Sequence, residues 1–294
     1  MDKKELSNYR KAGKIAREIK EYCKKTIKKG MLLTELAEKI ENKIIELGGY
    51  PAFPVDLSID DIAAHYSPIP DETTKASGLI KIDIGVHVEG CICDTAVTID
   101  LEDNKENKKL IEASDKALIE AIKVIKKDIE IKEIGKKVSE VIKKYNFASI
   151  VNLAGHELKP YIVHAGISIP NYDNNNSNKL QEGIYAIEPF STTGEGKVYD
   201  GGPSGVYNLN EIKAVREKDE REILAYIKKE YKTLPFSSRW IVKKFGKKSL
   251  ITLKFLESQK VVRQYSHLIE KAHGKVSQSE HTIYFDGEKV EILT

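Results

Sequence analysis

A predicted β-hairpin that carries two aspartates constrains this chain more than any other feature. Two runs rich in β-branched residues, 80–88 and 91–99, flank the dipeptide Glu89-Gly90, which suits a two-residue turn. With such a turn, the numbers of paired residues add to an odd total. Asp83 and Asp94 are therefore expected on the same face of the hairpin.

Two carboxylates on one face of an apolar hairpin cost free energy to bury unless a cation lies between them. A pair of divalent metal ions would meet that need. The alternative is that both aspartates face solvent, and the hairpin alone leaves that open. Further along the chain, other candidate ligands follow, and their order and chemistry indicate a hydrolase with two metal ions. In chain order the candidates are Asp83, Asp94, His156, Glu188 and Glu280.

Length and composition narrow the class of protein. The 294 residues suffice for one large domain and a smaller one. Cys23, Cys91 and Cys93 are too few for a disulfide framework, and nothing completes a zinc site around the last two. The chain opens on a charged amphipathic stretch and has no apolar run near the ~20 residues of a membrane span. We therefore expect a soluble, cytoplasmic protein with no membrane contact.

The net charge of +3 conceals a basic region. Residues 201–265 contain 15 lysines and arginines against 7 acids, so this part carries +8 and the remainder −5. Within it, residues 231–256 hold seven basic residues and no acid. Such a run usually forms a solvated helical face, and an anionic partner is the second interpretation.

Hydrophobic periodicity predicts helices on both sides of the hairpin and again near the C-terminus. The eight residues 33–40 resemble residues 131–138, which suggests two related halves. The glycine-rich stretch 194–205 is interpreted as a loop, and residues 278–285 as a strand that carries Glu280. This order fits an insertion inside one catalytic domain. The expected helices are 6–29, 34–47, 114–127, 131–145, 217–231, 238–245 and 250–258.

Several polar residues stand in unusual places. His156 and His164 flank a Tyr/Ile/Val stretch, and each adjoins or lies near a glycine. A lone histidine beside glycine is usually structural. Glu188 and Glu280, however, each interrupt an apolar segment, where an unpaired carboxylate would be costly. His65, in Ala63-Ala-His-Tyr66, adds a third histidine.

Together these motifs resemble the type II methionine aminopeptidases over almost the whole chain. The resemblance implies an α+β pita-bread fold, with pseudo-twofold halves and a curved antiparallel sheet, plus a small helical, winged-helix-like insertion. Residues 1–200 and 266–294 would form the catalytic domain, and residues 201–265 the insertion. The motifs are Lys81-Ile-Asp-Ile-Gly85, Asp94, Gly155-His156, Ile187-Glu188 and Glu280-His-Thr-Ile283.

The resemblance also implies a role for each candidate ligand. Asp83 would bind one metal ion, His156 and Glu188 the other, and Asp94 and Glu280 would bridge the two. Four carboxylates balance two divalent cations, so the set is electrostatically reasonable. Carboxylates with one imidazole suit Co, Mn, Fe or Zn, and the sequence does not distinguish these metals.

The implied reaction is removal of the N-terminal methionine from nascent proteins and peptides that have a small second residue. A metal-activated water would attack the methionyl carbonyl, and Glu188 would shuttle the proton to the leaving amine. His65 and His164 would donate hydrogen bonds to the intermediate and would also contact substrate. We also expect a monomer, although the sequence does not determine the oligomeric state, and the basic insertion is a candidate for contact with the ribosome. The implied methionine pocket consists of Phe53, Val163, Phe190 and Tyr265.

Three positions depart from the family pattern: Asp60 replaces an asparagine, Glu89 an aspartate or serine, and Pro189 a threonine. No ligand is lost, although Asp60 and Pro189 could change the shape of the pocket.

One alternative function is that of a prolidase or aminopeptidase P, which cleaves Xaa-Pro peptides. Such enzymes usually carry an extra N-terminal domain, whereas catalytic features here begin near Met1. The other alternative is a ribosome- or RNA-associated binding relative with vestigial activity, and the intact ligand set argues against it.

Overall fold

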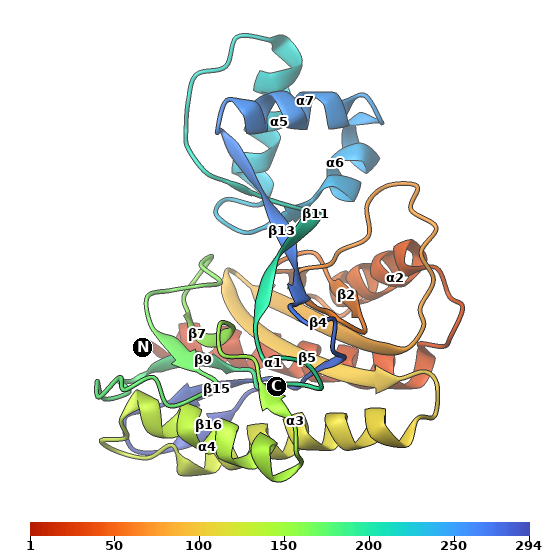
Figure 1. Ribbon diagram of the computed structural model, residues 1–294. Coiled ribbons are helices and arrows are strands. Elements are labelled where there is room, and N and C mark those ends of the chain that lie inside the picture. The colour runs from red at the N-terminus through yellow and green to blue at the C-terminus, as the bar shows by residue number, and fades with distance from the viewer.

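The computed structural model describes all of residues 1–294 and contains two related halves built on antiparallel strands (Figure 1). In the first half, the apolar side of α1 packs against β4 and β5 and helps to form a core of 30 buried residues. Asp2 caps α1, because its side chain accepts the Glu5 N–H. The first half comprises α1 (Lys3–Thr26), α2 (Leu33–Glu46), β1 (Tyr50–Pro51), β2 (Asp56–Ile59), β4 (Leu79–Val88) and β5 (Cys91–Asp100).

The second half repeats this plan, with two helices packed on antiparallel strands around a core of 17 buried residues. Helix α3 begins nine residues before the predicted start at 114, because Asn104 accepts the N–H groups of Glu106 and Asn107 and so caps an earlier turn. The second half comprises α3 (Lys105–Val124), α4 (Ile131–Lys144), β6 (Ala148–Ser149), β7 (Ala154–Leu158), β8 (Ser168–Pro170), β9 (Gly183–Ile187), β10 (Phe190–Thr192), β14 (Val276–Gln278), β15 (His281–Phe285) and β16 (Val290–Ile292).

Local contacts support the relation between the halves that the sequence suggested. Helices α2 and α4 start at Leu33 and Ile131, the first residues of the two similar segments. Immediately before each helix lies an isolated β-bridge, Leu32 to Lys75 in the first half and Glu130 to Lys179 in the second. The two helices therefore begin in equivalent surroundings.

The hairpin of β4 and β5 has the predicted register. Asp83 pairs with Ala96, and Gly85 pairs with Asp94, so the two aspartates share a face. Glu89 and Gly90 have φ values of 50° and 89°, as a type I′ turn requires. The local sequence thus places both carboxylates correctly.

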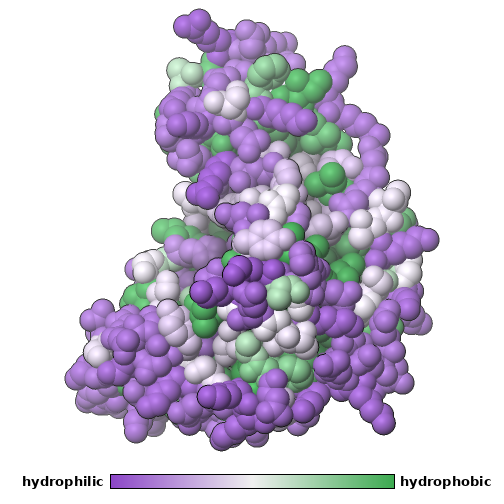
Figure 2. Space-filling view, in the orientation of Figure 1, coloured by the Kyte–Doolittle hydropathy of each residue, from purple (hydrophilic) through white to green (hydrophobic).

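A third group of elements extends from the two halves as a separate lobe, joined to them through the long strands β11 and β13 (Figure 1). It has its own core of ten buried residues, and its outer surface is mostly hydrophilic (Figure 2). The lobe and its neighbouring strands are β3 (Ile62–Ala64), β11 (Val198–Leu209), α5 (Lys218–Glu230), β12 (Phe236–Ser237), α6 (Ser238–Phe245), α7 (Ser249–Ser258) and β13 (Val262–Glu270).

Two predictions, one in the lobe and one in the second half, were wrong. Residues 201–205, interpreted as part of a loop, lie in β11, where the register with β13 shifts between Asp200 and Pro203 and again before Tyr207. Such irregularities accommodate glycine and proline within a strand. The strand predicted at 278–285 is broken at Ser279 and Glu280, because their N–H groups bond to Pro189 and Ala96 instead of continuing one ladder.

The lobe is fastened to the first half by a buried ion pair. Arg239 of α6 donates to both carboxylate oxygens of Glu41 on α2, and their side chains are 5% and 7% exposed. Trp240 Nε1 donates to the same carboxylate at 2.8 Å. A buried charge pair with this many hydrogen bonds fixes one orientation of the lobe.

None of the helices combines the length and the apolar character that a membrane-crossing helix needs.

Candidate functional site

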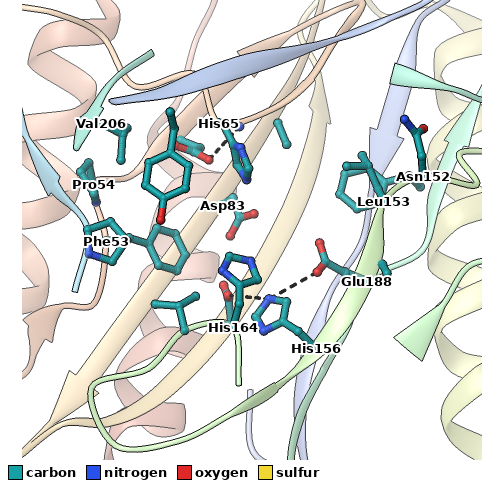
Figure 3. Close-up of a pocket in the computed structure, with 18 residues that line it drawn as sticks. Phe53, Pro54, His65, Asp83, Asn152, Leu153, His156, His164, Glu188 and Val206 are labelled. Carbon is teal, nitrogen blue, oxygen red and sulfur yellow. Dashed lines mark hydrogen bonds and ion pairs between the residues drawn. The ribbon is translucent and has the colours of Figure 1, made fainter. Parts of the chain in front are cut away.

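A cavity of about 180 Å³ lies where the two halves and the lobe meet (Figure 3). Its wall combines acidic, imidazole and apolar side chains. All the sequence-predicted site residues except Glu280 line it. These are Phe53, His65, Asp83, Asp94, His156, Val163, His164, Glu188, Phe190 and Tyr265.

The five candidate ligands come from both halves, and four of them line this cavity. His156 Nε2 lies 3.4 Å from Glu188 Oε1 and 3.8 Å from Asp94 Oδ2. Glu280 does not line the cavity, but its carboxylate joins Asp94 and His156 in a group whose ligand atoms all lie within 4.8 Å of one another. Asp83 shares its hairpin face with Asp94, and Figure 3 shows it across from Glu188.

These carboxyl groups are buried with too few partners. Asp83 Oδ1, Asp94 Oδ1 and both oxygens of Glu280 have no hydrogen-bond partner. Burial raises the pKa of Asp94, Glu188 and Glu280 well above the usual range, and the neighbouring carboxylates raise it further. Oxygen atoms that lack donors, next to one imidazole, form a set that divalent cations fit.

Two side chains that the sequence analysis missed belong to the same cluster. Gln278 Nε2 donates to Asp83 Oδ2 at 3.0 Å and lies 3.4 Å from Glu188 Oε2, so it joins ligands from the two halves. Asp56 lines the cavity, and its Oδ2 accepts the backbone N–H of His65 at 3.0 Å. Asp56 interrupts an apolar segment just as Glu188 does, and that signal could have identified it. Gln278 gave no comparable signal.

The three cavity histidines have neutral rings at neutral pH. Burial, and after it the neighbouring His164, lower the pKa of His156 to about 3 and that of His65 to about 4. Burial also lowers the pKa of His164. The rings of His156 and His164 lie 4.2 Å apart, while His65 meets the ring of Tyr265 edge-on at 5.8 Å. A neutral imidazole can donate one N–H toward a bound substrate.

The apolar part of the cavity matches the predicted methionine pocket in its members. Phe53 lies over Gly85, where a Cβ would come within 2.2 Å of the phenyl ring, so this approach needs glycine. Asp60 and Pro189, the two departures expected to affect the shape of the pocket, do not line the cavity. Asp60 instead accepts the Leu79 N–H at 2.9 Å, and the Pro189 carbonyl accepts the Ser279 N–H.

The basic run divides into buried and exposed residues. Arg239 is buried against Glu41 and is not available to a partner. Lys247 forms an exposed ion pair with Asp71 at 2.6 Å, and Lys232 lies 3.6 Å from the centre of the Tyr161 ring. No lysine of the run lines the cavity, so its charge is separate from the acidic cluster.

Comparisons with known proteins agree with this geometry. The profile of metallopeptidase family M24 matches residues 7–224. A methionine aminopeptidase of Pyrococcus abyssi is 47% identical over 288 residues, covering 96% of this chain and 97% of the relative. These matches confirm the resemblance predicted from the sequence.

Solved structures show the same fold. A methionine aminopeptidase from Thermotoga maritima aligns with a TM-score of 0.72 at 20% identity, covering 100% of this chain and 98% of that one. A prolidase from Pyrococcus furiosus aligns with a TM-score of 0.62 at 18% identity, but this chain covers 64% of it. Together with the family match, these alignments confirm the α+β pita-bread fold.

Proposed function

We propose that this chain, which belongs to metallopeptidase family M24, removes the N-terminal methionine from peptides and proteins. One observation carries the proposal beyond the relatives' names: a single cavity is lined both by apolar side chains and by a cluster of carboxylates and neutral histidines. An unbranched apolar side chain fits such a pocket, while its backbone amide meets the polar cluster.

We further propose that the cluster holds two divalent metal ions. Asp83, Asp94, His156, Glu188 and Glu280 would hold them, because these side chains converge and several of their buried oxygens lack any donor. Divalent ions bound there supply an activated water and polarise the peptide carbonyl. Co, Mn, Fe and Zn all accept this mixture of carboxylates and imidazole.

The chain's own residues would do the remaining work. Glu188 lines the cavity beside His156 and would accept a proton and pass it to the leaving amine. His65 and His164, both neutral, would donate N–H groups to the oxygen that gains charge. Gln278 would hold Asp83 and Glu188 in place, since its amide donates toward both.

Several finer features of the proposal come from the sequence and from the family resemblance. They are action on nascent chains, a cytoplasmic location, a monomeric state and contact with the ribosome through the basic insertion. The division into residues 1–200 with 266–294 and residues 201–265 belongs with them. It is supported by the separate core of the lobe, although both boundaries fall inside the paired strands β11 and β13.

The experiment that tests the proposed function compares two peptide classes. The protein is first freed of metal with a chelator. It is then incubated with Met-Ala-Ser or with a set of Xaa-Pro peptides, with and without added Mn²⁺, and the released amino acids are quantified. We expect methionine release that depends on Mn²⁺ and little cleavage of Xaa-Pro. Preferential cleavage of Xaa-Pro would favour the prolidase alternative. If added metal led to release of neither methionine nor the Xaa residue, the result would favour the alternative of a binding protein.

A further inference from the structure

The two halves meet beneath the acidic cluster through side-chain hydroxyl groups. The Thr282 hydroxyl accepts the Asp94 N–H and donates to the Asp94 carbonyl, each at 2.7 Å. Thr98 makes the same reciprocal pair with the backbone of Gln278. This junction sets how far β5 lies from the segment that carries Glu280.

One charged side chain reaches into the junction. Lys20 of α1 is only 9% exposed, and its Nζ donates to Thr95 Oγ1 at 2.9 Å. The same Nζ lies 3.3 Å from His281 Nδ1, which accepts, because an ammonium group has only donors. The Thr95 hydroxyl in turn donates to the Glu280 carbonyl at 2.9 Å.

These partners are the immediate neighbours of two proposed ligands. Thr95 follows Asp94 on β5, and successive strand residues point to opposite faces, so Thr95 lies on the side away from the cavity. His281 directly follows Glu280 at the start of β15. Lys20 therefore contacts the residue next to each of the two acids predicted to bridge the metal ions.

We propose that Lys20 and Thr95 form a latch that sets the separation of Asp94 and Glu280 and so preorganises the metal site. The inference rests on the proposed function, because it presupposes that these acids bind metal. Lys20 and Thr95 are positioning residues and touch no substrate. Partners that orient metal ligands from behind commonly govern metal affinity.

The charge of Lys20 and its position predict opposite effects on metal affinity when Lys20 is replaced. An ammonium group near the site repels divalent cations, so removal of its charge alone would strengthen metal binding. The charge does reach the site: burial lowers the pKa of Lys20 to about 8, and Glu280 opposes that shift. If the latch positions the ligands, removal weakens metal binding in spite of this gain.

The test measures Mn²⁺ affinity by calorimetric titration of protein that a chelator has freed of metal. Lys20→Met removes the ammonium group and keeps much of the side-chain volume. Thr95→Val removes only a hydroxyl and keeps every charge, so it remains informative if Lys20→Met folds poorly. Lys24→Met is the matched control, since Lys24 lies one turn further along α1 and pairs on the surface with Glu21 at 2.8 Å.

We expect both latch variants to bind Mn²⁺ about tenfold more weakly or worse, and Lys24→Met to match the unmodified chain. Unchanged or tighter Mn²⁺ binding by Lys20→Met and Thr95→Val would overturn the latch. A lower Tm of the metal-free variants with unchanged Mn²⁺ affinity would also overturn it, since that pattern indicates a structural role only. If the unmodified chain neither bound Mn²⁺ nor released methionine, the proposed function would fail first, and the latch with it.

Discussion

Asp56 lies directly opposite Asp83 in the register of β2 and β4, and both carboxyl groups are buried. Asp56 adds a fifth acid to a cluster that already holds Asp83, Asp94, Glu188 and Glu280. Burial, followed by the charge of Asp83, raises the pKa of Asp56 well above its usual value of 3.8. In the metal-free protein, ionised Asp56 therefore opposes folding.

The sign of this effect gives a prediction for Asp56→Asn. An acid whose pKa is raised by folding binds its proton more tightly in the folded state, so its cost appears above pH 3.8 and grows as the pH rises. We expect the metal-free variant to have a higher Tm at pH 7 and no advantage near pH 4. For a chain of about this size, each kcal/mol gained raises Tm by about 2–4 °C.

Thermal unfolding in the presence of a chelator checks this expectation. Asp200→Asn is the control, because Asp200 is exposed on β11. A variant at position 56 that lost stability at pH 7, or gained the same amount at pH 4, would contradict the account of the buried acid pair.

The pocket predicts a preference for small second residues. Phe53, Val163, Phe190 and Tyr265 form the apolar part of the cavity wall, and the remaining wall is occupied by the acidic and imidazole side chains, so the space for a second side chain is limited. We expect kcat/KM for Met-Ala-Ser to exceed that for Met-Lys-Ser and Met-Trp-Ser by at least about tenfold, the usual scale of a steric mismatch. Equal rates for alanine and tryptophan at the second position would rule out this pocket.

The basic run predicts salt-dependent association with the ribosome. Four lysines lie close together in the sequence, two in the last turn of α6 and two in the turn before α7. All four can be reversed to Glu at once: Lys243, Lys244, Lys247 and Lys248. If they contact phosphates, co-sedimentation with ribosomes should fall steeply with salt and weaken in the reversed variant, because fewer counterions are released. Cleavage of free tripeptides should not change, since none of the four lines the cavity.

A control for this experiment reverses four lysines on α4, at 136, 137, 143 and 144. These carry the same charge change on a different face of the molecule. If both variants lost co-sedimentation equally, or if binding did not depend on salt, the basic run would be interpreted as a solvated helical face without a ribosomal partner.

The sequence predicted local features better than distant ones. The hairpin register follows from a two-residue turn and alternating residues, and both are visible within twenty positions. Asp56 was missed because its importance comes from a neighbour on another strand, Asp83, 27 positions away. Gln278 was missed because it stands between two serines, in a strand that reads Val276-Ser-Gln278, where an uncharged amide gives no cost signal comparable to that of a carboxylate.

Glycine and proline misled the prediction near the lobe. Gly201, Gly202 and Pro203 indicated a loop, yet they lie in a long strand whose partner tolerates shifts in register. Pairing with β13 is a tertiary effect that no local pattern encodes. The break at Ser279 has a similar cause, because its N–H bonds to Pro189, 90 positions earlier.

Five side chains from the two halves are proposed to hold the metal ions that make methionine release possible. The most direct measurement is methionine release from Met-Ala-Ser while Mn²⁺ is added to chelated protein, for the unmodified chain and for His156→Ala and Glu280→Ala. We expect activity to rise up to two equivalents of Mn²⁺ in the unmodified chain. Each variant should remain folded, and its rate of methionine release should fall by more than about a hundredfold. Loss of a residue that only orients a metal ligand already lowers metal affinity or activity by about 10–100-fold. Near-normal turnover by Glu280→Ala, or full activity without metal, would contradict the account.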